Sequence, residues 1–195
     1  MGESHTFLAK TIHWLFIVLY AYGIFKQIED IEQLEDTGLL IFEVIFASVF
    51  LLIVIMRYVY MRRFETFQGA TVTVPKIHKY FAKTVHRLMY LCLILLPITG
   101  LMIAGLYSQG YTNEDQFMLN SALEIHGLSA DLSYLLIVIH IGAAFWSRIK
   151  GEGVWSSMVP IWKENGISNN QYVAKISKIE EKFYHKMDEF WSSRK

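Results

Sequence analysis

Two histidines that share one apolar segment are the first residues in the chain that could do chemistry. His126 and His140 are 14 residues apart. At about 100° per residue, this separation brings a helix to within about 40° of four full turns, so both side chains project from one face about 21 Å apart. Imidazole is a common ligand of metal centres, and a histidine inside an apolar span is costly unless it is bound or paired. The spacing therefore predicts two stacked metal-containing cofactors, one near each end of the segment.

The elements that would position these histidines are four apolar stretches near the length of a membrane span, which needs about 20 residues. A soluble all-α protein of this size would show apolar stripes beside polar faces. One of the four stretches, Leu88–Leu106, contains no charged residue, and 53% of the chain is hydrophobic. We therefore predict an all-α integral membrane protein with four spans: Phe7–Phe25, Leu39–Tyr60, Leu88–Leu106 and Leu128–Trp146.

The charges of the loops predict how the spans are oriented. The first loop, KQIEDIEQLEDTG, is acidic, the second is rich in Lys and Arg, and the third has three acids and no Lys or Arg. Arg148 and Lys150 follow the fourth span. By the positive-inside rule, both termini and the middle loop are expected in the cytoplasm, and the two acidic loops outside it. Four spans in this order form an up-down-up-down four-helix bundle.

The tail differs in kind from the spans, and we divide the chain into a transmembrane part, 1–160, and a cytoplasmic tail, 161–195. In the tail, Val173, Ile176, Ile179 and Phe183 recur at helical spacing among Lys and Glu residues. This pattern predicts an amphipathic helix. Such a helix could lie on the membrane, contact a partner or be solvated.

The orientation of the spans suggests a partner for His140. His13 lies near the start of the first span and is expected at the level of His140, so the two could supply both axial ligands of one haem iron. Alternatively, they are unrelated buried histidines that hydrogen-bond to the backbone. His86 is expected in the same leaflet and could replace either histidine or contact a haem propionate.

The remaining basic candidates have simpler expectations. We expect His78 at the surface, and His5 and His185 in solvent. Arg57 and Arg87 lie at the level where haem propionates would emerge, although both also suit ordinary topogenic charge. The single cysteine, Cys92, is not part of a Cys-x-x-Cys-His motif, so any haem is held without a covalent bond. The net charge of zero does not suggest a nucleic-acid partner.

Several of these segments, taken together, resemble the bacterial cytochrome b561 family. They are His13-Trp14-Leu15, the run from His86 to Tyr90 followed by Leu96-Pro97-Ile98-Thr99-Gly100, and His126 with His140. The resemblance covers roughly residues 6–160. The family is similar in turn to the cytochrome b subunits of nickel-iron hydrogenases and formate dehydrogenases.

The resemblance implies two b haems in a four-helix bundle of the bacterial inner membrane, which exchanges electrons with ubiquinone or another quinone. One type of member oxidises superoxide at the periplasmic face. By this resemblance, His13 and His140 match the ligands of the cytoplasmic haem, and His126 matches one ligand of the periplasmic haem. The other periplasmic ligand is expected 14 residues before Arg57, where this chain has Glu43.

Glu43 makes the second haem doubtful, and with it any reaction that needs electrons to cross the membrane. Glu43 could ligate iron, accept a hydrogen bond from His126, carry protons or face the headgroups. We therefore predict an electron-transfer cytochrome with one firmly bound haem b, and superoxide:ubiquinone oxidoreductase activity as the specific version. The alternative is a non-catalytic membrane anchor that docks a soluble oxidoreductase.

Overall fold

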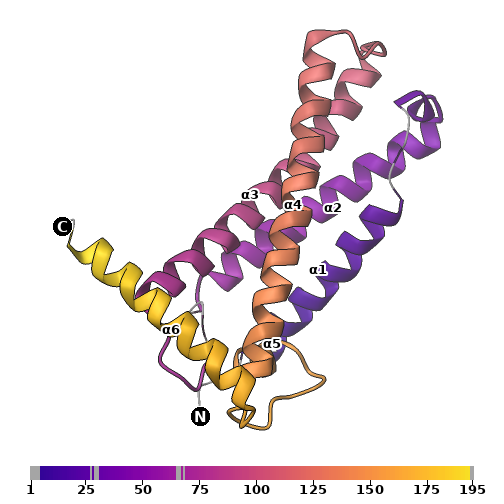
Figure 1. Ribbon diagram of the computed structural model, residues 1–195. Helices are drawn as coiled ribbons and strands as arrows, with labels where there is room; N and C mark the ends of the chain where they lie inside the picture. Colours follow the sequence, from indigo (N-terminus) through magenta and orange to yellow (C-terminus); the bar gives the residue numbers. More distant parts are fainter. Residues whose placement is uncertain (1–4, 27, 29–30, 65–66, 68, 194–195) are drawn as a thin grey trace. The chain divides into compact units, whose positions relative to one another are not determined.

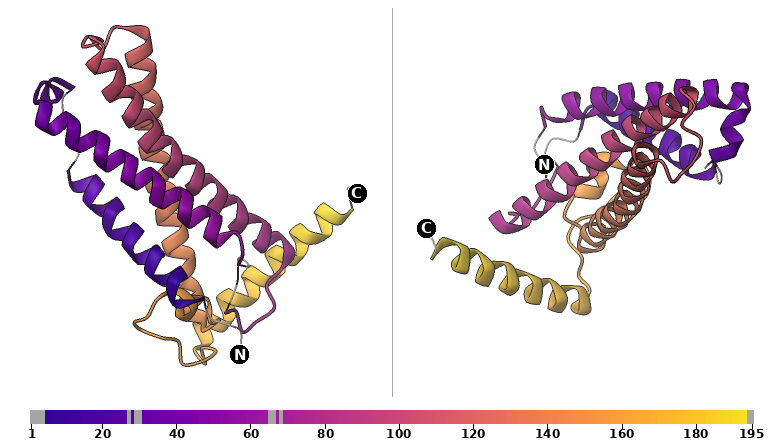
Figure 2. Two further views of the ribbon diagram at one scale, coloured as in Figure 1. Left: turned by 180° about the vertical axis from the view of Figure 1, so that it is seen from behind. Right: turned by 90° about the horizontal axis from the view of Figure 1, so that it is seen from above.

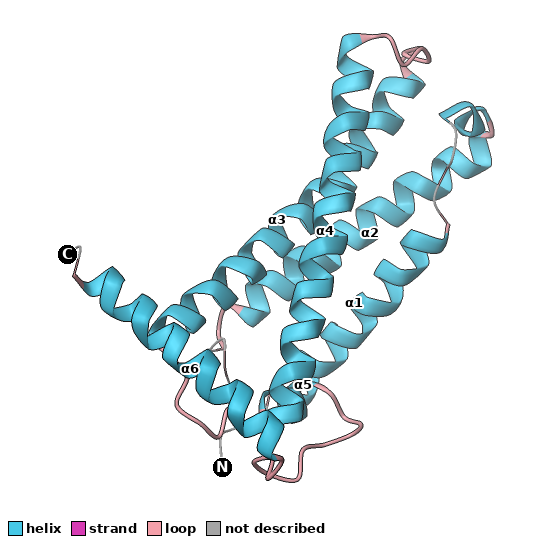
Figure 3. Cartoon of the chain, viewed as in Figure 1, coloured by secondary structure: helices cyan, strands magenta, loops and turns pink. Residues whose placement is uncertain are grey.

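The computed structural model consists of helices and the loops that join them (Figure 1). It describes residues 5–26, 28, 31–64, 67 and 69–193, so parts of the first acidic loop, of the basic loop and of both ends of the chain lie outside the described residues. Figure 3 shows helix and loop but no strand in the part of the chain that is described. The elements are α1 (Phe7–Phe25), the 3-10 helix η1 (Ile31–Glu35), α2 (Thr37–Met61), α3 (Lys76–Ser108), α4 (Phe117–Lys150), α5 (Val154–Met158) and α6 (Gln171–Ser192).

Four of the helices, α1 to α4, are long and apolar enough to cross a membrane. The prediction of an all-α membrane bundle with an additional C-terminal helix is thus confirmed. The predicted and observed limits of α1 agree, but α3 and α4 begin 12 and 11 residues before the predicted spans, at Lys76 and Phe117. Hydropathy marks only the segment that crosses the hydrocarbon, whereas helical hydrogen bonding continues into the polar flanks until a residue stops it.

Local sequence explains where two of these helices begin. Asp36 precedes α2, and its Oδ1 accepts hydrogen bonds from the backbone N–H of Gly38 at 2.8 Å and of Leu39 at 3.4 Å. These bonds satisfy N–H groups that have no partner within the helix. Pro75 directly precedes α3, where its fixed φ and missing N–H are tolerated. The α3 helix also continues through Pro97.

The chain packs as two compact units: α1, α3 and α4 each contribute residues to both, and α2 lies entirely in unit 2. Unit 2 comprises residues 11–61 and 88–136. Within it, α1 and α2 lie side by side in both views of Figure 2, and a Cβ on Gly23 of α1 would lie 3.4 Å from the Phe46 ring of α2. The rings of Phe16 and Phe50 are 5.4 Å apart between the same helices. At the end of unit 2 that includes the first acidic loop, Leu34 of η1 packs with buried residues of α3 and α4.

Unit 1 comprises residues 1–10, 62–87 and 137–195. Its loops are joined by backbone hydrogen bonds, including Thr71 N–H to Glu152 O at 2.8 Å and Ser168 N–H to Lys150 O at 3.0 Å. Gly153 has a φ of 89°, and a Cβ there would lie 2.4 Å from the carbonyl oxygen of Gly69. Glycine is therefore required where these two loops cross.

Candidate functional site

His13 of α1 is held by an arginine of α2 within unit 2. Arg57 Nη2 lies 2.6 Å from His13 Nδ1. A guanidinium has donors only, so Nδ1 accepts this bond and the proton of the neutral imidazole is on Nε2. A neutral imidazole that binds a metal through Nε2 carries its proton on Nδ1 instead, and can no longer accept from Arg57. Ligation through Nε2 and the Arg57 hydrogen bond therefore exclude each other.

Arg57 is a largely buried cation for which the described residues supply no carboxylate partner. Its guanidinium lies over the ring of Phe16 at 4.9 Å and near that of Tyr90 at 5.7 Å. Its Nε–H is buried without a hydrogen-bond partner, and no described carboxylate lies within ion-pair distance of it. Buried charges in proteins are normally paired. A cofactor that carries carboxylate groups and is ligated by His13 would fit this place. Ligation would break the hydrogen bond between His13 and Arg57, and a carboxylate of the cofactor could then pair with the guanidinium.

His126 of α4 contacts the middle of α3, also within unit 2. Its Nδ1 is 2.9 Å from Thr99 Oγ1. The Thr99 hydroxyl proton is directed to the carbonyl of Leu95 at 2.7 Å or of Leu96 at 3.0 Å, so its oxygen accepts from the imidazole N–H. This arrangement puts the proton on Nδ1 and leaves the lone pair on Nε2. A partner at Nδ1 is the usual support of a histidine that binds metal through Nε2.

Glu43, on α2, has a partner other than His126. It forms an ion pair with Lys26, which directly follows α1. The Lys26 ammonium also lies 4.6 Å from the centre of the Phe46 ring and 5.1 Å from that of Phe42. Both charged side chains are largely shielded, with 15% and 20% of their surfaces exposed. Glu43 is thus engaged by a cation, at the position where the resemblance placed the second ligand of the periplasmic haem.

His86 and His140 come together within unit 1. Their ring centroids are 4.9 Å apart, with an angle of 67° between the planes. His13 belongs to unit 2 and His140 to unit 1, and their pairing stays a prediction. Arg87 is exposed, whereas Arg57 is largely buried.

Two of the other histidines differ from expectation. His78 is half-buried instead of exposed, and its ring stacks on Tyr184 of α6 at 4.8 Å. His5 was expected in solvent but is buried with 8% of its surface exposed, and its ring meets that of Phe64 edge-on at 5.2 Å. Burial and then the charge of Lys10 lower the pKa of His5 below its ordinary value of 6.5. The position of His5 near a terminus did not predict its exposure, because the segment before α1 packs into unit 1.

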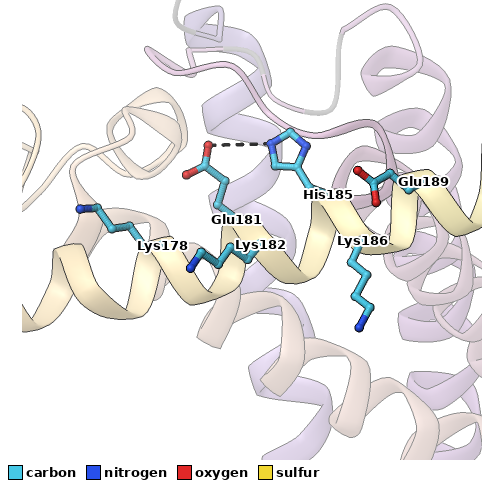
Figure 4. Close-up of a pocket in the computed structure, with 6 residues that line it drawn as sticks. All are labelled: Lys178, Glu181, Lys182, His185, Lys186 and Glu189. Atoms are coloured by element: carbon cyan, nitrogen blue, oxygen red, sulfur yellow. Dashed lines mark ion pairs between the residues drawn. The ribbon is translucent and has the colours of Figure 1, made fainter.

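His185 is exposed, as expected, on a shallow hollow over one face of α6 (Figure 4). Its Nε2 lies 3.9 Å from a carboxylate oxygen of Glu181, and the other lining residues are lysines and Glu189. Within the described residues, no group of three or more His, Cys, Asp or Glu side chains could hold a metal ion.

Sequence reasoning missed two residues of this site, Lys26 and Thr99. Lys26 is the first charge after an apolar span, and Glu43 is the only acid inside the next one. Their pairing could have been suspected from that. Thr99 was noted only as part of a motif, and no pattern in the sequence indicates its contact with His126.

Together, the fold and the half-buried histidines of its spans define an α-helical membrane protein suited to a cofactor that is ligated by imidazole. The family model described as prokaryotic cytochrome b561 matches residues 4–160. The chain belongs to this family, and is a multi-pass membrane cytochrome of the b type that functions in electron transfer and binds haem b. No curated protein and no solved structure matches it.

Proposed function

We propose that the chain holds one haem b between His13 and His140 and exchanges electrons with a quinone on the cytoplasmic side of the bacterial inner membrane. The observation that carries the proposal is the largely buried Arg57 beside His13, a cation with no described carboxylate within ion-pair distance. Two imidazoles would fill both axial positions of the iron, so a redox partner would exchange electrons at the haem edge. When bound, haem supplies a one-electron ferric/ferrous couple.

The residues of the chain have separate tasks in this proposal. His13 and His140 ligate through Nε2 and carry their protons on Nδ1. Arg57, once it is released from His13, neutralises a propionate. Phe16 and Tyr90 cover Arg57 and exclude water from it. His86, beside His140, is placed to hold a proton or to contact a second propionate.

We include no second haem, because Glu43 pairs with Lys26. A superoxide oxidase that takes its electron at the periplasmic face would need a path across the membrane, and a single haem near the cytoplasm does not provide one. We therefore favour electron exchange between haem and quinone on the cytoplasmic side alone. Residues 1–160 form the haem-binding part in this proposal, and residues 161–195 form a tail outside it.

Alanine variants test the ligands. His13→Ala and His140→Ala should each lose haem or convert it from low-spin to high-spin, whereas the exposed His185→Ala is the matched control and should retain the full spectrum. A full low-spin spectrum in His13→Ala would contradict the proposal and would favour His86 as the ligand. Purified protein should be reduced by a quinol and not by superoxide. Inertness toward quinol would favour an anchor subunit that serves a soluble oxidoreductase.

Cysteine labelling tests the orientation. In a background without Cys92, cysteines at positions 70–74 of the basic loop should react only from the cytoplasm, and those at 113–116 only from the periplasm. The reverse pattern would overturn the orientation given by the loop charges.

A further inference from the structure

One face of α6 is fixed to the ends of the membrane helices in unit 1. Glu180 accepts from Trp146 Nε1 at 2.9 Å and from Lys150 Nζ at 3.0 Å, both on the last turns of α4. Asp188 accepts from the backbone N–H of Ile77 at 3.1 Å, at the start of α3. Tyr184, between these two acids, stacks on His78. Burial and then the negative charge of Glu180 raise the pKa of Tyr184, so it stays neutral in this contact.

These contacts place α6 at the level of the membrane surface. Trp146 and Lys150 end a membrane-spanning helix, where tryptophan and basic residues prefer the headgroup region. Glu180 is near the middle of α6, so the helix is fixed beside the headgroups by its centre.

A second face of α6 is apolar and uncovered. Four exposed side chains lie within about 40° of one line along the helix, at 100° per residue. They are Tyr172, Ile176, Ile179 and Phe183. Between 50% and 80% of the surface of each is exposed. This apolar stripe lies about a third of a turn from the face that contacts α3 and α4, so those contacts leave it open.

The free charge beside the apolar stripe is positive. Four exposed lysines lie along the edge of the stripe that faces away from the contacts with α3 and α4: Lys175, Lys178, Lys182 and Lys186. Of the four acids of α6, Glu180 and Asp188 are occupied by α4 and α3, which leaves Glu181 and Glu189 to oppose the lysines. Figure 4 shows this polar side, with Lys186 pointing away from Glu181 and His185. Apolar residues flanked by lysines are typical of helices that lie in the membrane interface.

We propose that α6 lies in the surface of the membrane, with its apolar stripe among the upper acyl chains and its lysines at anionic lipid headgroups. A lipid surface is the occupant that suits both the level of Trp146 and the charge of the lysines. The amphipathic tail is thereby a second membrane contact that supports the ends of α3 and α4. This inference depends on the membrane insertion of α4 and not on haem or quinone.

The test compares two neighbouring positions on opposite faces. Ile179→Cys lies on the apolar stripe, and Lys178→Cys lies about 130° from its centre. Each is made in full-length Cys92→Ala protein, labelled with an environment-sensitive fluorophore and placed in nanodiscs of phosphatidylcholine with and without phosphatidylglycerol. The label at 179 should emit at shorter wavelength and be quenched several-fold more by doxyl lipid than by aqueous iodide, and the label at 178 should show the opposite preference.

Charge variants test the lipid class. Lys175→Gln/Lys182→Gln/Lys186→Gln should lower lipid quenching at 179 in phosphatidylglycerol discs to the level seen in phosphatidylcholine alone. Equal iodide quenching at 178 and 179 would overturn the proposal. The proposal would also be overturned if the label at 179 were protected from iodide in detergent to a degree that depends on protein concentration. That result would indicate that a second copy of the chain covers the apolar stripe. The haem spectrum is recorded separately, so a failed haem assignment does not alter the result.

Discussion

Replacing Arg57 with methionine removes the largely buried cation beside His13 while keeping a long apolar side chain. Without haem, the variant loses one charged hydrogen bond, worth about 1.5–3 kcal/mol, and two ring contacts, but it no longer holds a guanidinium whose Nε–H is buried without a partner. These terms oppose each other, so the haem-free protein should fold with nearly unchanged stability. With haem, a propionate loses its counter-ion. Removing one partner of a buried pair costs about 3–5 kcal/mol, which corresponds to a fall in haem affinity of at least about a hundredfold.

Haem titration of the haem-free protein, with pyridine haemochrome analysis of the protein as purified, measures this effect. Arg57→Lys keeps the charge and should bind haem within about tenfold of the unmodified protein, since only the planar fork is lost. Arg63→Met, at a position after the end of α2, is the matched control for loss of one positive charge. Haem retained by Arg57→Met should have a lower reduction potential, because a nearby cation favours ferrous iron. Unchanged affinity in Arg57→Met would refute the reasoning that links Arg57 to a propionate.

Three further predictions concern stability, each measured by thermal unfolding in detergent. Lys26→Met leaves the shielded Glu43 without its cation and should lower stability by about 1–3 kcal/mol after allowance for partial exposure, whereas Lys26→Met/Glu43→Met should recover most of the loss. If the double variant were no more stable than the single one, the ion pair would not be the cause. Thr99→Val removes the acceptor of the His126 N–H and should cost about 1–3 kcal/mol, while Thr99→Ser should cost less than half of that; equal losses would point to packing. His5 has a pKa below 6.5 in the folded protein, so the unfolded chain takes up the proton first and stability falls as the pH drops below about 6.5. The melting temperature of His5→Phe should therefore decrease less between pH 7.5 and 5.5, and an identical decrease would exclude this role.

The positions of the spans could be predicted because hydropathy reports on the lipid environment that each helix must satisfy. Phe7–Phe25 agrees between the predicted span and α1, since the apolar run and the helix end together. The early start of α3 at Lys76 could not be predicted in this way, because the polar turns before Leu88 are helical without being apolar. Stacking of His78 on Tyr184 likewise depends on the packing of α6, which local periodicity does not specify.

The sequence indicated which residues belong to the candidate site, but it did not indicate which side chains they contact. His13, His126 and His140 stood out because a histidine is rare and costly inside an apolar span. Their contacts join residues far apart in the sequence, such as Arg57 with His13 and Thr99 with His126. Glu43 was recognised as a departure from the expected histidine, but its engagement by Lys26 required the packing of α1 against α2.

The haem content of the purified full-length protein tests the central claim most directly. Pyridine haemochrome analysis against quantitative amino-acid analysis, with low-temperature EPR on the same sample, counts the haems and reports their spin state. We expect one non-covalently bound haem b per chain with low-spin iron. Two low-spin haems per chain, or folded protein without haem, would contradict it.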